Sequence, residues 1–339
     1  MTYFTLWLAS FITTALIPFK ELRTYLIIVL VITYWGLISF RGLGVDADYH
    51  QYVEYMTDVV NYNGDSRGGY LFDLLTKLIY MSGFPITLIF SVYAISVPIK
   101  AYLFSRFSPY GHAIFLAYIG FFIYLHDFTQ IRAGLAIAFG YWALYLRNEQ
   151  HKSWLGFAVL SVVIHPSLLL IFVFAYVSKF VTRRMLLITL FISIVIAYFD
   201  LLSPIIERIV NFIGNSQLTL YYHLAQDGQV IKPFGVFPSI CLVLTLIISH
   251  QLPKCNSINK LTILFIKMLL VSQIAWYLFY CVPVFASRIS QLFLFSIVFL
   301  LPIISKVLLK SYVLLPSIFS ILGFTAYIYV GGLLNNYTF

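Results

Sequence analysis

The sequence predicts an all-α fold, a polytopic helical bundle embedded in a membrane. Hydrophobic residues make up 61% of the 339 residues and charged residues only 10%, which leaves too little polar surface for a protein dissolved in water. Apolar runs of about 17 to 25 residues, the length that crosses a bilayer as a helix, follow one another almost without interruption. The runs are continuous rather than alternating, which argues against a closed β-barrel.

Ten of these runs are long enough to be full spans, and they leave no room for a separate soluble domain. We therefore expect residues 1–339 to form a single transmembrane domain, and we expect the first run to be retained because no basic leader or cleavage site accompanies it. The expected spans are residues 2–19, 24–40, 84–104, 110–126, 128–146, 185–203, 236–252, 261–281, 289–305 and 312–331.

Basic residues in short connections mark the cytoplasmic side of a membrane protein. The excess of 21 Lys and Arg over 12 Asp and Glu therefore reports orientation here, and not nucleic-acid binding. We place these residues on the cytoplasmic side: Lys20, Arg23, Lys100, Arg106, Arg147, Lys152, Lys179, Arg183, Arg184, Lys254, Lys260, Lys306 and Lys310.

Two connections are longer than a turn, and we expect both on the outer side. The first is residues 41–83, in which the stretch Tyr70–Tyr80 is apolar with Asp73 and Lys77 four residues apart, a pattern typical of an amphipathic helix lying in the interface. The second is residues 204–235.

The segment 154–178 has two possible paths. It lies between two basic connections that the charge rule puts on the same side, whereas one helix of this length would span about 37 Å and separate them. A hairpin of two short helices broken at His165–Pro166 resolves the conflict, because proline removes a backbone donor and disfavours helix at the residue before it. We favour the hairpin, which brings the total to about 12 membrane helices.

Four segments carry arginine, aspartate or histidine where membrane anchoring does not require them, and such groups usually mark a site. On the hairpin topology all four face outward. Three outward arginines, Arg41, Arg132 and Arg288, suit a diphosphate, because guanidinium binds phosphate at two points and keeps its proton. The four segments are Arg41–Tyr49, Gln130–Gly134, His165–Ser167 and Ala286–Ile289.

Each arginine also has a simpler interpretation. Arg41 and Arg288 lie at expected helix ends, where a cation can complement the helix dipole. Arg132 could extend to the outer headgroups. It shares a helical stripe with Ala136 and Gly140, however, and stripes of small residues pack against neighbouring helices, so we expect Arg132 to face the bundle.

Asp46, Asp48 and His165 are the candidate catalytic groups. The two acids form an Asp-x-Asp pattern that could supply a general base or hold a divalent cation, or one acid could simply pair with Arg41. His165 is either a base or a hydrogen-bonded packing residue. We favour His165, because its intrinsic pKa is near neutral and Arg41 should lower the pKa of Asp46.

Other residues could assist these groups. His126 and Asp127 lie beside Arg132 in the sequence and could support it, while Tyr222 and His223 could stack on sugar rings or only mark the interface. The three cysteines have no metal-ligand spacing, and we expect neither a metal site nor a cofactor.

These motifs, in this order, resemble the EpsG-like branch of the Wzy polysaccharide polymerases, which make O-antigen, capsule or exopolysaccharide. His50 stands where the family pattern has a tyrosine, with Tyr49 next to it. The residues that carry the resemblance are Phe40, Arg41, Gly44, Asp46, Gln130, Arg132, Gly134, His165, Ser167, Ser287 and Arg288.

The resemblance implies a GT-C-like glycosyltransferase of the bacterial cytoplasmic (inner) membrane. Such an enzyme joins oligosaccharide repeat units carried on undecaprenyl diphosphate at the outer face, moving the growing chain to a hydroxyl of an incoming unit. The implied partners are these lipid-linked oligosaccharides, membrane lipids and a chain-length regulator protein, with no nucleic acid. We assign substrate positioning to Gln130, Ser167, Tyr49, Tyr222 and His223.

Three other classes remain open. A lipid-linked oligosaccharide flippase would also need arginines, but distributed along a central path with short outer loops. A membrane acyltransferase would want its histidine near a thioester arriving from the cytoplasm, opposite to this charge layout. A ligase of the O-antigen type shares the chemistry of a polymerase, and the sequence does not separate the two.

Overall fold

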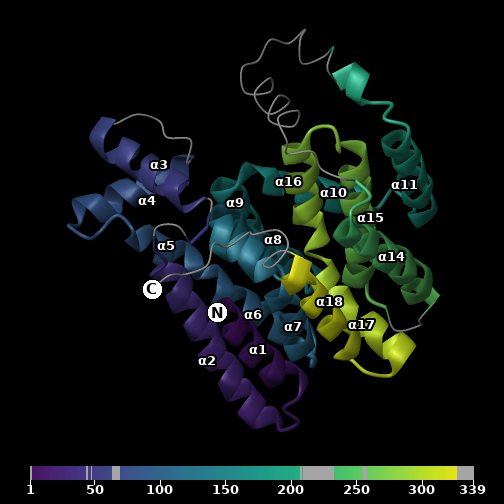
Figure 1. Cartoon of the computed structure of the whole chain (residues 1–339), viewed down its shortest axis with the longest axis horizontal. Coiled ribbons are helices and arrows are strands. Elements are labelled where there is room, and N and C mark those ends of the chain that lie inside the picture. The colour runs from purple at the N-terminus through teal and green to yellow at the C-terminus, as the bar shows by residue number, and fades with distance from the viewer. Residues whose placement is uncertain are drawn as a thin grey trace. The chain divides into compact units, whose positions relative to one another are not determined.

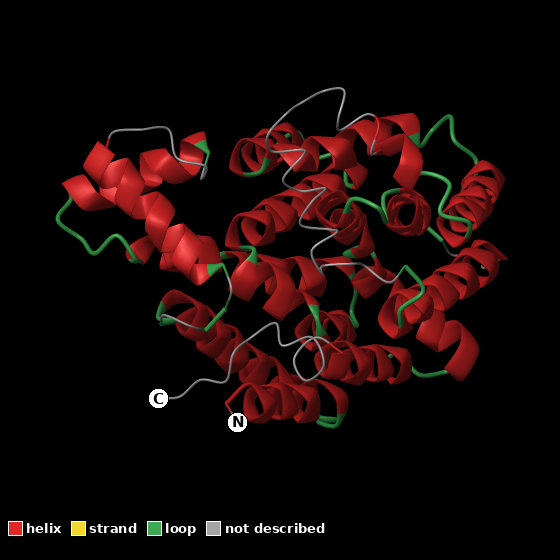
Figure 2. Ribbon diagram, turned by 45° about the horizontal axis from the view of Figure 1, so that its top comes forward, coloured by secondary structure: helices red, strands yellow, loops and turns green. Residues whose placement is uncertain are grey.

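The computed structural model describes residues 2–42, 45–46, 48–62, 69–206, 208, 233–254 and 258–326. In these residues every regular element is a helix and no strand is present (Figure 2). The all-α prediction is confirmed. The chain forms two compact units, one made of Met1–Leu169 with Leu301–Phe339 and the other of Leu170–Leu300, called units 1 and 2 below.

Unit 1 contains the first half of the chain and the last helix. Within it α8 packs against α9, and α7 lies against α1 and α18 (Figure 1). Its elements are α1 (Thr2–Ala15), α2 (Lys20–Ser39), α3 (Tyr49–Tyr62), α4 (Tyr70–Met81), α5 (Leu88–Ala94), α6 (Ser96–Phe107), α7 (Gly111–Gly120), the π-helix η1 (Ile123–Thr129), α8 (Ile131–Asn148), α9 (Trp154–Ile164), the 3₁₀ turn η2 (Pro166–Leu168) and α18 (Leu314–Phe324).

Unit 2 is built around α15, which packs against α11, α14 and α16. Its elements are α10 (Leu169–Val177), α11 (Arg183–Tyr198), α14 (Val236–Gln251), the 3₁₀ turn η3 (Leu252–Lys254), α15 (Lys260–Leu278), α16 (Pro283–Leu294) and the first residues of α17 (Ile297–Leu309).

The described helices contain four candidate membrane spans by length and composition: Lys20–Ser39, Leu88–Phe107, Val236–Lys254 and Lys260–Leu278. Two bent helix pairs, α7 with η1 at 69° and α16 with α17 at 53°, raise the number to six if each pair is one span. Four further apolar helices have 10 to 17 residues. The chain has the helices of a membrane protein, while the count of ten spans stays a prediction.

The expected break at His165–Pro166 is present. α9 ends at Ile164, His165 is extended (φ −149°, ψ 102°), and Pro166 starts the turn η2. Proline at the first position of a helical turn costs no hydrogen bond, which explains why the turn begins there. α9 and α10 belong mainly to different units, so the hairpin path itself stays a prediction.

The first long connection is more helical than the sequence indicated. The expected helix is α4, and the sequence analysis did not foresee α3, which packs against it. The position of α4 at a membrane interface stays a prediction. Of the second connection, residues 207 and 209–232 lie outside the described residues, and so do Tyr222 and His223.

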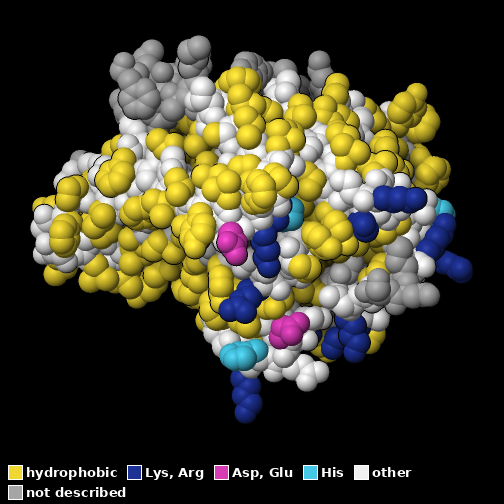
Figure 3. Space-filling model, turned by 90° about the horizontal axis from the view of Figure 1, so that it is seen from below, with side chains coloured by type: hydrophobic (Ala, Val, Ile, Leu, Met, Phe, Trp, Pro, Cys, Tyr) yellow, Lys and Arg dark blue, Asp and Glu magenta, His cyan; other side chains and the backbone are white. Residues whose placement is uncertain are grey.

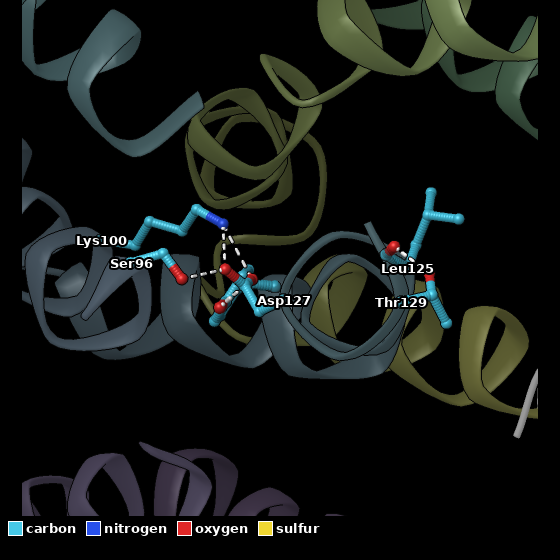
Figure 4. Close-up of polar contacts among 6 residues, drawn as sticks. Ser96, Lys100, Leu125, Asp127 and Thr129 are labelled. Carbon is cyan, nitrogen blue, oxygen red and sulfur yellow. Dashed lines mark hydrogen bonds and ion pairs between the residues drawn. The ribbon is translucent and has the colours of Figure 1, made fainter. Parts of the chain in front are cut away.

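Lys100 is not in a cytoplasmic connection, and that expectation was wrong. It lies inside the candidate span Leu88–Phe107 with a fully buried side chain, and its Nζ is 2.7 Å from Oδ1 of Asp127 on η1 (Figure 4). Ser96 and Tyr118 also donate hydrogen bonds to the Asp127 carboxylate. The charge rule applies to basic residues in loops, and Lys100 is instead a helix residue. The sequence did not reveal this, because its partner Asp127 comes 27 residues later.

We predict that breaking this ion pair destabilises the protein strongly. Lys100→Met or Asp127→Asn alone should lower the free energy of unfolding by about 3–5 kcal/mol, because each leaves one buried group without its partner. The Lys100→Met/Asp127→Asn double variant should lose less than the sum, since removing both charges leaves no unpaired buried ion. Denaturation of the purified protein in detergent measures this, with the exposed Lys152→Met as control. Strictly additive losses would contradict the pairing.

Candidate active site

Arg41 and Asp46 form a buried ion pair in the connection between α2 and α3. Arg41 Nη1 is 3.3 Å from Asp46 Oδ2, and neither side chain is exposed. The guanidinium also lies over the ring of Phe90, 4.5 Å from its centroid, and the backbone N–H of Asp48 donates to Asp46 Oδ1 at 3.0 Å. The sequence left open whether one acid of the Asp-x-Asp pattern is a base, holds a cation or pairs with Arg41. In the structure Asp46 pairs with Arg41.

Burial, and not the neighbouring arginine, dominates the ionisation of Asp46. Burial raises the pKa of the Asp46 carboxyl to about 6 from 3.8, and the Arg41 guanidinium acts in the opposite direction with a smaller effect. Arg41 lowers this pKa, as the sequence predicted, but burial outweighs the effect and the net shift is upward. Because the pKa of Asp46 is higher in the folded protein than in the unfolded chain, protonation of Asp46 stabilises the fold. This stabilisation is complete below about pH 4 and is lost as the pH rises through about 6.

Tyr52 connects this ion pair to Arg132. The Tyr52 hydroxyl accepts a hydrogen bond from Arg132 and interacts electrostatically with Asp48 and Arg41. Tyr52 is buried on α3, whereas Arg132 is half-buried at the start of α8. The structure thus brings the first motif and the Gln-x-Arg motif together, as the sequence predicted.

Arg132 is surrounded by residues of α3, α4 and α5. Its guanidinium carbon is 5.9 Å from the centroid of the Phe72 ring, and it interacts electrostatically with Tyr93. A Cβ built at Gly69 would lie 3.5 Å from Arg132 Nη1. These contacts confirm that Arg132 faces the helices of unit 1, as the stripe of small residues indicated.

The histidine motif joins the same region through η1. His165 Nδ1 and Ser167 Oγ are 2.6 Å apart, so the turn η2 orients the imidazole. His165 also interacts electrostatically with His126, whose side chain in turn interacts with that of Gln130, the residue immediately before α8. Three of the four motifs therefore lie within unit 1, linked through Tyr52, His126 and Gln130.

The fourth motif lies in the other unit. Arg288 is exposed on α16 of unit 2 and sits five residues into that helix, not just before a helix as expected. Its approach to Arg132 stays a prediction. Tyr49 is largely buried, with its ring stacked on Phe90 at a centroid distance of 5.1 Å, so the ring serves packing.

Exposure divides the candidate residues into two groups. The ion pair of Arg41 and Asp46 is buried and cannot meet a ligand directly in this conformation. The half-buried residues keep part of their surface accessible and are the ones able to touch a substrate. These are Asp48, Gln130, Arg132, His165 and Ser167.

Sequence reasoning gave no role to Tyr52 or Tyr93, and it connected His126 with Arg132 but not with His165. Tyrosine is abundant in this chain, with 26 residues, so no single tyrosine stood out. The π-helix η1 could not be predicted from any pattern in the sequence. At its end the Gln130 N–H donates a hydrogen bond to the carbonyl oxygen of Leu125 at 3.2 Å. Among the described residues no group of three or more His, Cys, Asp or Glu could hold a metal ion.

The model of the EpsG family matches residues 24–338 of this chain. Neither the curated proteins nor the solved structures give a match.

Gly134 is where α8 passes closest to η1, which yields a prediction. A Cβ there would lie 2.7 Å from the carbonyl oxygen of His126 and 2.8 Å from Asp127 Oδ1, both parts of a tightly packed element. Gly134→Ala should therefore lower the free energy of unfolding by about 1–3 kcal/mol. Gly156→Ala on α9 meets nothing within 4 Å and should be neutral or stabilising. Equal stability of the two variants in detergent denaturation would contradict the close approach.

Proposed function

We propose that this chain, which belongs to the EpsG family, polymerises lipid-linked oligosaccharides. Membership of that family suggests a polysaccharide polymerase or a glycosyltransferase-like function in a membrane. The substrate is an oligosaccharide repeat unit on undecaprenyl diphosphate, and the reaction takes place at the outer face of the bacterial cytoplasmic membrane. The observation that carries the proposal is the linkage of Arg132 and His165, a phosphate-binding group and a base, through Gln130 and His126 in one unit.

The reaction exchanges one bond for another. The acceptor hydroxyl oxygen forms a bond to C1 of the donor sugar, the bond from C1 to the diphosphate oxygen breaks, and the acceptor proton goes to a base. The leaving group carries the developing charge, so a fixed cation beside it lowers the barrier. Arg132, held by Tyr52 and half exposed, is suited to this role, and Arg288 is the second arginine that we assign to the diphosphate.

His165 is the residue that we assign as the base. A neutral imidazole can take the proton of the acceptor hydroxyl near neutral pH. In the tautomer that acts as the base, Nδ1–H donates to Ser167 Oγ, 2.6 Å away, and Nε2 is unprotonated and faces the acceptor hydroxyl. Asp48 and Gln130, both half-buried, can hydrogen-bond sugar hydroxyls.

Arg41 and Asp46 take a positioning role in this mechanism. Their buried ion pair fixes the connection that precedes α3, and α3 presents Tyr52 to Arg132. An oligosaccharide ligase remains the second candidate, because it would use the same residues on the same leaving group.

We predict that Arg132→Lys and Arg288→Lys both lose most polymerisation while the protein still accumulates in the membrane. Lysine keeps the charge but cannot reproduce the planar two-point grip on a diphosphate. The measurement is the length of the surface glycan in cells that lack the native gene and carry each variant. Single capped repeats are the expected product, and the exposed Arg184→Lys is the control.

Each alternative gives a distinct result in those cells. Complete chains left on the carrier lipid would indicate a ligase, and repeat units trapped inside would indicate a flippase. Full-length glycan from both lysine variants would mean that the arginines only anchor the protein.

We predict that His165→Ala abolishes coupling of purified lipid-linked repeats at every pH while substrate binding persists. Asp46→Asn should retain measurable turnover, because Asn can still accept the Asp48 N–H and the residue is too buried to reach the acceptor. If His165→Ala instead remains active and its activity rises with pH through about 6, the pKa of Asp46, the base is Asp46.

A further inference from the structure

Unit 2 contains a cavity of about 280 Å³ whose lining includes no residue of the motifs discussed above. It lies where the start of α11, the turn η3 and the first half of α15 meet. Its walls are mostly apolar, but two of its lining residues are basic. The lining residues are Arg183, Pro253, Ile258, Ile263, Ile266 and Lys267.

The two basic residues are fixed by the ends of neighbouring helices. Arg183 Nη1 donates to the carbonyl oxygen of Ser249, near the end of α14, at 2.5 Å. Lys267 Nζ donates to the carbonyl oxygen of Ser178, just after α10, at 2.6 Å. A guanidinium has five N–H donors and an ammonium has three. Each group therefore has further N–H donors with which it can bind a ligand, beyond the one carbonyl named here.

No carboxylate balances this pair of cations in the described part of unit 2. The one acid there is Asp200, which follows the far end of α11, about 24 Å from Arg183 by the helix rise. Four exposed basic residues lie close in sequence to the cavity but outside its lining: Lys179, Arg184, Lys254 and Lys260. Figure 3 shows one face of the molecule, on which Lys and Arg side chains stand among hydrophobic ones.

We propose that this cavity binds the phosphate headgroup of an anionic phospholipid. Two cations on an otherwise apolar wall match a ligand with a phosphate next to hydrocarbon, and basic pockets between membrane helices bind such headgroups. Free phosphate would not need the isoleucine walls, and a neutral lipid would not need the two cations.

The depth of the two cations fits a headgroup. α15 begins at Lys260, and Lys267 follows seven residues later, about 10 Å along the helix. Arg183 is the first residue of α11. A lysine this far into a candidate span is costly unless it meets an anion or the interface, and its long side chain can extend back toward the headgroup level.

The experiment measures lipid binding by the purified full-length protein in detergent, using native mass spectrometry. The probes are dioleoylphosphatidylglycerol and dioleoylphosphatidylcholine, each titrated separately. We expect Arg183→Gln and Lys267→Gln each to weaken phosphatidylglycerol binding about fivefold and to leave phosphatidylcholine binding unchanged. Glutamine removes the charge and keeps a polar side chain, whereas Lys267→Arg keeps the charge and should retain binding.

The matched controls are Arg184→Gln and Lys260→Gln, which remove exposed basic residues of the same types outside the cavity. They should change phosphatidylglycerol binding little. Equal losses from controls and cavity variants would overturn the proposal in favour of a diffuse surface charge. Equal binding of the two lipids by the unmodified protein, or displacement of phosphatidylglycerol by inorganic phosphate at matched ionic strength, would also overturn it. None of these outcomes depends on polymerase activity.

Discussion

The cost of placing charge in an apolar environment governs this structure. In a chain with only 12 acids, two of them, Asp46 and Asp127, form ion pairs in which neither side chain is exposed. Removing ions from water costs several kcal/mol each, so such pairs persist only where hydrogen bonds complete them. Asp127 has Ser96 and Tyr118, and Asp46 has the N–H of Asp48. Each pair sits beside an irregular backbone segment, the connection before α3 or the π-helix η1, and fixes a conformation that helix propensity alone would not specify.

These two irregular segments position the accessible groups of the candidate site. The connection before α3 leads to Tyr52, which holds Arg132, and η1 carries His126, which is tied to Gln130 and interacts with His165. A π-helix places its residues on a different angular spacing from the α-helix that follows, and such segments are frequent at functional sites. The acids of the buried ion pairs lie two or three residues from the nearest half-buried groups, Asp48 and Gln130. The residues that hold the site are therefore distinct from those able to touch a ligand.

The sequence was sufficient for the fold class, the family, the helix break at Pro166 and the meeting of Arg132 with the first long connection. Each of these depends on a local signal, namely an apolar run, a proline or a motif. The sequence was not sufficient for Lys100, because its partner Asp127 is distant in the chain and only tertiary packing brings the two together. The same holds for Asp46. Arg41 lowers its pKa as the sequence predicted, but the extent of burial, a property of the folded chain, has the larger effect and raises it.

The arrangement also explains why a glycine follows the arginine by two residues in the Gln-x-Arg-x-Gly motif. Arg132 and Gln130 must approach η1 from the start of α8, and a side chain at position 134 would meet the His126 carbonyl and the Asp127 carboxylate. A larger residue there would push α8 away from η1, and the same displacement would separate Gln130 from His126. The glycine, the arginine and the buried aspartate are thus parts of one packing requirement: the helix that presents the arginine has to lie directly on the segment that the ion pair holds in place.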